Sequence, residues 1–433
     1  MSSFKNNARE KSVMPVEKDR RSSLYSGWYI VAASFVILFF NAGARFAISV
    51  MFKPLIAEFG WSRGTLSLAF FLNMTVYAIS LIFVGRFYDR YGPKWVLIIS
   101  TLFLSAGFMS IFLVTSLWQF FICYGVLAAI GMGGTAVNFL AAVTSKWFKK
   151  RRGLAVSLAL SGSCIGQFAL VPLFTIFVYR IGWRASYFWI GCIMFLVNII
   201  LAVLVIKGDP EPGVTSPSAK ASRKNGDGNR EQVSLHACLR DLDLWEAMRT
   251  RSFWMFCAVM FVCGSGDFLM TTHWIAYTTD HGISPTTAGN MLAWFGLMSL
   301  VGILVAGTAS DRIGNRIPLA ITFALRVIMF LLILRVENAV SFYIFALVFG
   351  FTFFITAPLT PTLIGRLFGL THIGLIGGAV TTIHHLGGGL WAYVGGVIFD
   401  HTGSYHWAFG ISMLMAGAAV LCALLIKEER HEP

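Results

Sequence analysis

A few ionisable side chains lie inside long apolar stretches of this chain, where a charge without a partner is costly and is therefore usually functional. Arg45 and Asp267 are the most informative of them, because they occupy corresponding places in the two halves of a chain that repeats itself, and each lies between a small residue and a phenylalanine. A guanidinium can hold a carboxylate, and a buried carboxylate can take up a proton. We expect these two groups to form an ion pair or to share an anion and a proton. A purely structural ion pair is the alternative.

Three histidines and a second arginine belong to the same class. His384 and His385 are neighbours before a glycine run, and on a helix their side chains point about 100° apart, so one at most faces a cavity. We assign His385 to carboxylate binding, because an imidazole can also take up a proton near neutral pH. His384 and His273 are assigned to proton coupling. A helix-packing hydrogen bond is the alternative for His384 and His385, and an interfacial position is the alternative for His273. Arg326 lies too deep to reach water, which indicates a structural or coupling role with an acceptor still to be found.

Uncharged polar side chains complete the set of candidate substrate contacts. Asn138 and Gln167 are favoured, and Asn41 and Tyr393 are further candidates. Amide side chains in such positions also commonly join helices to one another. The sequence has no metal-binding pattern, no cofactor motif and no GxxxxGK[S/T] nucleotide motif, so we expect neither an enzyme nor a nucleotide-driven pump.

The elements that must hold these residues are membrane-spanning helices. The chain is 57% hydrophobic and 12% charged, whereas soluble globular proteins have about 25% charged residues. A helix of about 20 apolar residues crosses a hydrocarbon core of roughly 30 Å. The sequence therefore predicts an all-α membrane protein with twelve transmembrane helices, near 28–52, 65–86, 95–114, 118–145, 154–178, 185–206, 253–279, 286–308, 317–335, 338–365, 373–399 and 405–426.

The repeat is clearest in a short charged motif. The string GxxxDRxGx[K/R] begins at Gly85 and again at Gly307, after an apolar stretch in each case, and the same spacing separates Arg45 from Asp267. This repeat predicts two pseudo-symmetric six-helix bundles, the product of an internal duplication. The expected segments are a tail (1–27), a bundle (28–207), a linker (208–251), a second bundle (252–426) and a short tail (427–433). We expect the charged pairs of the two motifs to form a gate that holds one end shut in one state; these pairs are Asp89 with Arg90 and Asp311 with Arg312.

Most Lys and Arg residues lie in the two tails and in the loops on the same side of the predicted membrane. This distribution predicts that both termini are cytoplasmic, in a plasma or inner membrane. The net charge of +14 is therefore explained by topology and lipid contact, and we expect no nucleic-acid partner. A monomer is expected.

The doubled motif and the six-plus-six plan resemble the major facilitator superfamily of secondary transporters over the whole chain. Strings at 47–53, at 147–153 and from His385 to Gly389 resemble its monocarboxylate and oxalate/formate branch. The resemblance implies a carrier of a small organic anion, most simply a monocarboxylate moved together with protons, in which two halves rock about a midplane site. Members of that branch typically have an arginine in the eighth helix, but residues 291–307 contain none, so either the anchor lies elsewhere or the substrate is not a simple monocarboxylate.

Two other functions stay open at this point. One is antiport, either as exchange of organic anions or as export of an amphipathic compound. The other is a transport-inactive solute sensor that signals through the linker 208–251. The linker contains no recognisable folded module, which favours a carrier over a sensor.

Overall fold

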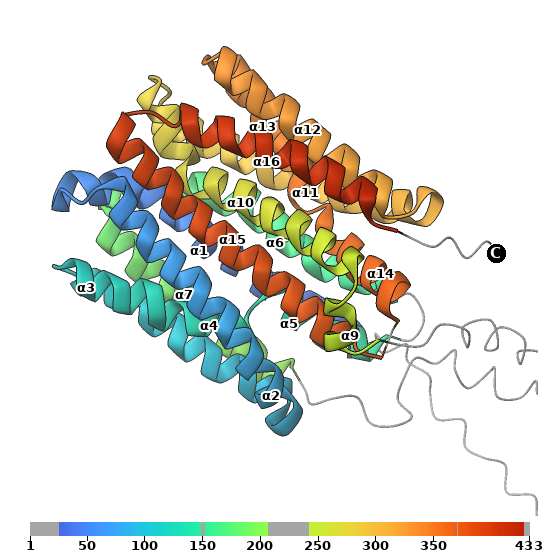
Figure 1. Cartoon of the computed structure of the whole chain (residues 1–433). Coiled ribbons are helices and arrows are strands. Elements are labelled where there is room, and N and C mark those ends of the chain that lie inside the picture. Colours follow the sequence, from blue (N-terminus) through green and yellow to red (C-terminus); the bar gives the residue numbers. More distant parts are fainter. Residues whose placement is uncertain (1–25, 149–151, 207–241, 370, 428–433) are drawn as a thin grey trace, which may run out of the picture.

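The computed structural model describes residues 26–148, 152–206, 242–369 and 371–427, which are helical almost throughout and contain no strand. The elements are drawn in Figure 1. Their bounds are α1 Ser26–Phe59, α2 Arg63–Ser110, η1 Ile111–Leu113, α3 Leu117–Phe120, η2 Phe121–Ala128, α4 Ala129–Gly134, α5 Val137–Trp147, α6 Arg152–Ile181, α7 Trp183–Leu204, α9 Leu244–Met248, α10 Arg251–Asp280, α11 Pro285–Ile313, α12 Arg316–Arg335, α13 Ala339–Phe353, α14 Thr356–Phe368, α15 Ile373–Thr402 and α16 His406–Leu425.

Ten helical segments of the described chain are long and apolar enough to cross a membrane. One of them, Arg63–Leu113, contains two of the predicted crossings, because the chain reverses within α2 at Gly92, whose φ of +78° favours glycine. The predicted crossing at 373–399 corresponds to α15, whose glycine and histidine residues lower its hydropathy below that of the ten segments. The prediction of an all-α membrane fold with twelve crossings is thereby confirmed.

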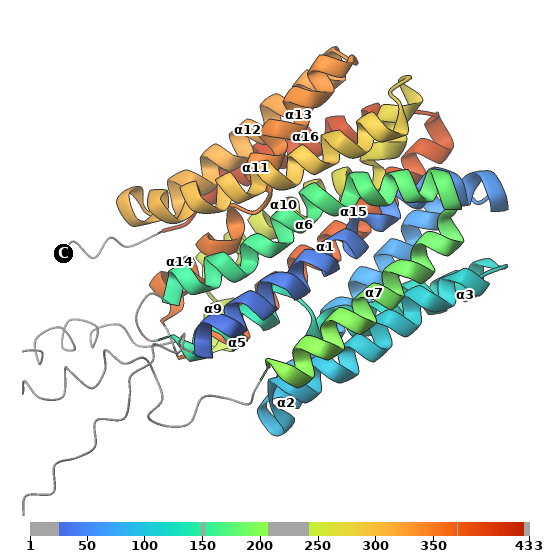
Figure 2. The ribbon, with the colours of Figure 1, turned by 180° about the vertical axis from the view of Figure 1, so that it is seen from behind.

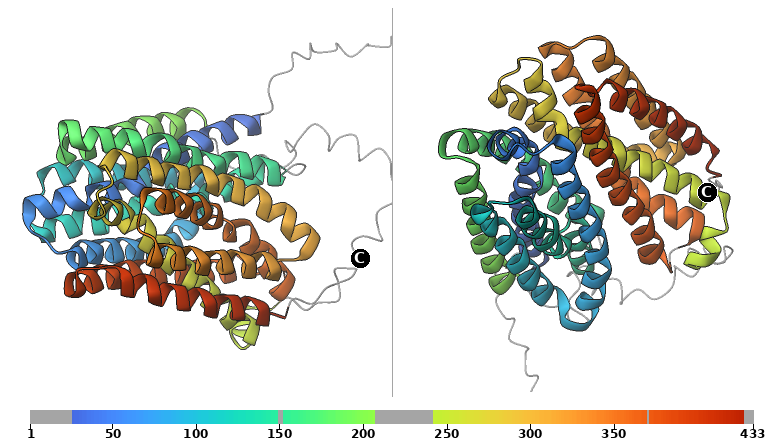
Figure 3. Two further views of the ribbon diagram at one scale, coloured as in Figure 1. Left: turned by 90° about the horizontal axis from the view of Figure 1, so that it is seen from above. Right: turned by 60° about the vertical axis from the view of Figure 1, so that its left-hand side comes forward.

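The helices form two bundles that lie side by side. The N-terminal bundle contains α1 to α7, and the C-terminal bundle contains α10 to α16, as the right-hand view of Figure 3 shows. Three helix pairs join them, namely α2 with α15, α6 with α11 and α1 with α10, and Figure 2 shows α6 alongside α11. Most of the predicted linker and tails fall outside the described residues, so the segment boundaries stay a prediction.

Each bundle contains helices whose backbones touch. A Cβ added to Gly264 of α10 would overlap the carbonyl oxygen of His384 in α15, and one added to Gly162 of α6 would overlap that of Phe35 in α1. Glycine is required at both crossings, because any side chain would force the helices apart. The close contact fixes the His384 backbone against α10.

The fourth crossing is irregular. It passes from α3 through the π-helical turn η2 into α4, and the helix is interrupted at Thr135 and Ala136 before α5 begins. An amide pair holds this interruption: Asn41 Nδ2 donates to the Thr135 carbonyl at 3.2 Å, and Asn198 Nδ2 donates to Asn41 Oδ1 at 3.4 Å. Irregular backbone at membrane depth occurs where it is buried in protein or lines a cavity.

Candidate functional site

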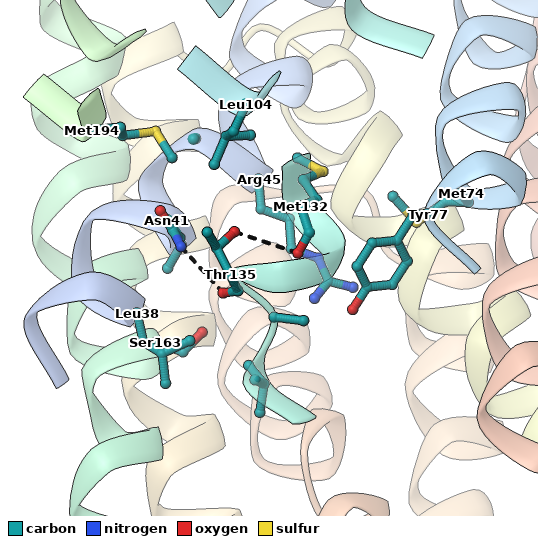
Figure 4. Close-up of a pocket in the computed structure, with 14 residues that line it drawn as sticks. Leu38, Asn41, Arg45, Met74, Tyr77, Leu104, Met132, Thr135, Ser163 and Met194 are labelled. Carbon is teal, nitrogen blue, oxygen red and sulfur yellow. Dashed lines mark hydrogen bonds between the residues drawn. The ribbon is translucent and has the colours of Figure 1, made fainter. Parts of the chain in front are cut away.

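A pocket in the N-terminal bundle contains Arg45 (Figure 4). It encloses about 510 Å³, including the space at its open mouth. We call it the Arg45 pocket; its lining consists of Leu38, Asn41, Ala42, Ala44, Arg45, Met74, Tyr77, Leu104, Met132, Thr135, Ala136, Val137, Ser163 and Met194. One charged group among largely apolar side chains is typical of a small-molecule binding site.

The guanidinium of Arg45 has no ionic partner in the part of the chain that the structure describes. The side chain is half-buried, and its Cζ lies 5.3 Å from the ring centre of Phe268 in the other bundle. Within the described ranges, no carboxylate lies at ion-pair distance from it. A cation in a largely apolar pocket without a counter-ion favours binding of an anion.

Asp267 has a partner that the sequence analysis did not assign to it. Its Oδ1 lies 2.7 Å from Arg326 Nη2, and both side chains are at least 97% buried. Arg326 also donates to the Thr352 hydroxyl at 3.1 Å and to the Cys263 carbonyl at 3.2 Å. The expected direct ion pair between Arg45 and Asp267 is therefore wrong, because Asp267 is paired with Arg326 of α12 inside its own bundle. The same contact supplies the acceptor that was missing for Arg326. The other form of the expectation, in which Arg45 and Asp267 share an anion and a proton, stays a prediction.

His384, and not His385, lies beside this pair. Possible ligand atoms of Cys263, Asp267 and His384 lie within 4.8 Å of one another, and the buried Nδ1 of His384 has no hydrogen-bond partner. The guanidinium of Arg326 already balances the carboxylate, so the cluster suits a proton better than a metal cation. His385 instead donates from Nδ1 to the Thr381 carbonyl at 2.8 Å, and its ring centre is 4.8 Å from that of Tyr77.

The four predicted neutral contacts lie in four different places. Asn41 lines the Arg45 pocket, with both ends of its amide engaged. Asn138 has an exposed side chain in the first turn of α5. Gln167 is fully buried and donates to the Leu292 carbonyl at 3.0 Å, so it joins α6 to α11. Tyr393 stacks on Phe71 with ring centres 6.5 Å apart, between α15 and α2.

A cluster of ionic contacts closes one end of the molecule, which we call the closed end. Asp280 of α10 binds two cations of the other bundle, Lys53 Nζ and Arg63 Nη2, each at 2.7 Å. Asp400 accepts from the backbone N–H groups of Arg63 at 3.0 Å and Gly64 at 2.7 Å. A carboxylate at a helix N-terminus is favoured by the helix dipole. These contacts cross between the bundles, and the sequence analysis missed them, although acids and bases flank the same helix ends in the sequence.

His273 belongs to this closed end. The Tyr405 hydroxyl accepts from Arg63 Nη1 at 3.0 Å and donates to His273 Nδ1 at 2.8 Å, while His273 Nε2 donates to the Ala392 carbonyl at 2.9 Å. Burial raises the pKa of Tyr405, so the phenol keeps its proton. This network requires a neutral His273 with its proton on Nε2.

The predicted gate residues lie at the opposite end. The side chains of Asp89, Arg90 and Arg312 are exposed, and the Arg90 guanidinium lies 5.2 Å from the ring centre of Tyr91. The side chain of Asp311 is outside the described set. A gating role for these four residues stays a prediction.

Comparisons with known proteins agree with this architecture. The family model of the Major Facilitator Superfamily matches residues 34–276 and 255–433. The MFS-type transporter YcxA of Bacillus subtilis is 26% identical over 94% of this chain and 96% of its own length. Monocarboxylate transporter 13 of Rattus norvegicus is 24% identical over 92% of this chain and 89% of its own. A solved structure of a D-xylose-proton symporter, 16% identical, superposes over 94% of this chain and 98% of that chain with a TM-score of 0.71.

The family match covers nearly the whole chain, and the two helical bundles have the fold of its solved structural neighbours. The chain therefore belongs to the Major Facilitator Superfamily and is a multi-pass membrane transporter, not an enzyme.

Proposed function

We propose that this transporter moves a small organic anion, most simply a monocarboxylate, together with a proton by alternating access. The proposed setting is the cytoplasmic membrane, with both termini on the cytoplasmic side. One observation carries the proposal: Arg45 presents to a largely apolar pocket a guanidinium that has no counter-ion among the described residues.

The charges of the described helix interiors support an anionic substrate. Arg45 and Arg326 are cations, and the single carboxylate of Asp267 forms its ion pair with Arg326. One positive charge is left over in a region of low dielectric, where a substrate carboxylate would be strongly favoured over a neutral solute. The similarity to monocarboxylate transporter 13 points to the same class of substrate.

The pair of Asp267 and Arg326 is the proposed site of proton coupling. Protonation of Asp267 would remove its charge and weaken its hold on Arg326, so α10 and α12 would respond to the proton. His384 adds a buried ring nitrogen without a partner beside the carboxylate and could pass the proton on. The fold is also that of a D-xylose-proton symporter, a protein whose name includes proton coupling.

The test is uptake of radiolabelled acetate, lactate and pyruvate into proteoliposomes with an inward proton gradient. Arg45→Gln should lower uptake about 100-fold, because a bond to a charged group is lost in a desolvated site, while Arg45→Lys should keep part of it. Asp267→Asn should abolish the response to the gradient but still permit exchange of labelled for unlabelled anion.

Three outcomes would contradict the proposal. Equal uptake by Arg45→Gln and wild type would exclude Arg45 as the anchor. Uptake that does not respond to the pH gradient would exclude symport, and activity in exchange alone would favour antiport.

A further inference from the structure

The Arg45 pocket contains a second anion-binding element, which is made of backbone. We propose that the substrate carboxylate lies between the guanidinium of Arg45, the free N–H groups of the first turn of α5 and the hydroxyl of Tyr77. This inference rests on the proposed transport of an organic anion and adds the groups that recognise it.

The start of α5 is an open helix N-terminus inside the pocket. The first helical hydrogen bond runs from Leu140 N to Ala136 O at 3.0 Å, so within the described structure the N–H groups of Val137, Asn138 and Phe139 have no acceptor. The N-cap is Ala136, whose side chain cannot accept a hydrogen bond. Ala136 and Val137 both line the pocket. The eleven-residue helix that begins there therefore has its positive dipole end at the wall of the pocket that contains Arg45.

Tyr77 points independently to a bound ligand. Its side chain belongs to the pocket lining and is 7% exposed, yet its hydroxyl has no hydrogen-bond partner among the described residues. The ring is held against His385 of the other bundle, with ring centres 4.8 Å apart. Figure 4 shows the phenol extending toward the guanidinium of Arg45. The hydroxyl of this pocket-lining side chain is therefore free to donate a hydrogen bond to an anion that enters beside the guanidinium.

The rest of the lining indicates what the anion carries. Most of the remaining lining is aliphatic or thioether, with the neutral polar side chains of Asn41, Thr135 and Ser163 among it and no second cation; the large apolar side chains are Leu38, Leu104, Met74, Met132 and Met194. Such a wall accepts an apolar body of variable shape, because methionine side chains adapt, and disfavours a second charge. The site should therefore take a carboxylate with a short hydrocarbon chain and reject its dicarboxylate counterpart.

Binding to the purified full-length chain tests the site without requiring transport. Isothermal titration calorimetry would compare butyrate with uncharged butyramide and with succinate, for wild type and three variants. Tyr77→Phe removes the hydroxyl alone. Val137→Pro removes one N–H from the first turn and suits the backbone there, since Ala136 is already extended (φ −71°, ψ 155°) and proline is tolerated at the first helical position. Val137→Ala is its matched control, because it shortens the side chain and keeps the N–H.

We expect wild type to bind butyrate and neither of the other probes. Tyr77→Phe should weaken butyrate binding about tenfold, and Val137→Pro should weaken it about tenfold more than Val137→Ala does, because each loses one hydrogen bond to a charged acceptor. Size-exclusion profiles check folding, and if Val137→Pro fails to fold, Tyr77→Phe decides the outcome.

The inference is overturned if Tyr77→Phe binds like wild type and Val137→Pro binds like Val137→Ala, or if wild type binds butyramide as well as butyrate. No binding of butyrate, acetate or phenylacetate would overturn it too. If the binding pattern holds but no proton-driven uptake occurs in proteoliposomes, the proposed symport is wrong and the anion site stands.

Discussion

The two bundles carry opposite charges at matching positions and use them differently. Arg45 of α1 faces a pocket without a carboxylate, whereas Asp267, its counterpart in α10 by the spacing of the repeat, is paired with Arg326 inside its own bundle. The duplication thus preserved the position of an ionisable group but not its partner. In our proposal, the unpaired charge of one bundle binds the substrate anion, and the ion pair of the other bundle responds to the proton.

The closed end shows the same divergence at another matched pair. Glu58 and Asp280 are separated by the same spacing as the two charged motifs. Glu58 accepts from Trp183 Nε1 at 2.6 Å and binds Arg184, both in its own bundle. Asp280 instead binds Lys53 and Arg63 of the opposite bundle. Glu58 therefore stabilises contacts within one bundle, whereas its counterpart Asp280 joins the two bundles.

The largest effect on stability should come from breaking the ion pair of Asp267 and Arg326. Arg326→Met leaves the Asp267 carboxylate buried without a partner and should lower the free energy of unfolding by about 3 to 5 kcal/mol. Arg45→Met removes a cation that has no ionic partner and should change it by less than ~1 kcal/mol. Thermal unfolding of both variants in detergent, without ligand, measures the contrast.

A double variant sharpens this contrast. Arg326→Met with Asp267→Asn has no charge left in the C-terminal pair and should recover most of the lost stability. If Arg326→Met and Arg45→Met lowered the free energy of unfolding equally, the contrast between the paired Arg326 and the unpaired Arg45 would be wrong.

A smaller effect is expected from Tyr405→Phe at the closed end. The hydroxyl links Arg63 to His273, and its loss leaves a buried ring nitrogen unsatisfied, so stability should fall by about 1 to 2 kcal/mol. Tyr77→Phe is the matched control, because its hydroxyl has no partner within the described part of the protein and its loss should leave ligand-free stability nearly unchanged. Similar melting temperatures for the two variants would contradict the assignment of the Tyr77 hydroxyl to a ligand.

The smallest effect, on hydrogen–deuterium exchange, should distinguish Asp280 from Glu58. Asp280→Asn should speed hydrogen–deuterium exchange about fivefold on both sides of the closed end, in the first turn of α2 and the last turn of α10, since partly exposed ion pairs contribute about 1 kcal/mol. Glu58→Gln should affect peptides of its own bundle alone. Added salt should reduce the Asp280→Asn difference, and a change limited to one bundle would contradict the role of Asp280 as a link.

The fold could be predicted from the sequence because its two signals, the length of each apolar stretch and the repeated charged motif, can each be recognised without knowing which helices pack together. The candidate site could be predicted in part. Arg45, Asp267 and Arg326 were recognised as intramembrane charges, but their pairing depends on which face of α10 meets α12, and helical spacing alone does not give that face. Tyr77 was missed because a tyrosine in an apolar helix has no local signal. The start of α5 was missed as well. The glycine-rich segment 131–134 indicates that the fourth crossing can bend, but it does not show at which residue the helix is interrupted.

The interruption between α4 and α5 has an evolutionary consequence. Main-chain donors are present whatever side chains the positions carry, so sequence drift around residues 136–139 can alter the shape of the recognition surface without deleting its donors. Distant homologues could then share the same mode of carboxylate capture with little identity in this segment. A survey of relatives would find it by comparing where the fourth crossing is interrupted, and residue-by-residue alignment would overlook it.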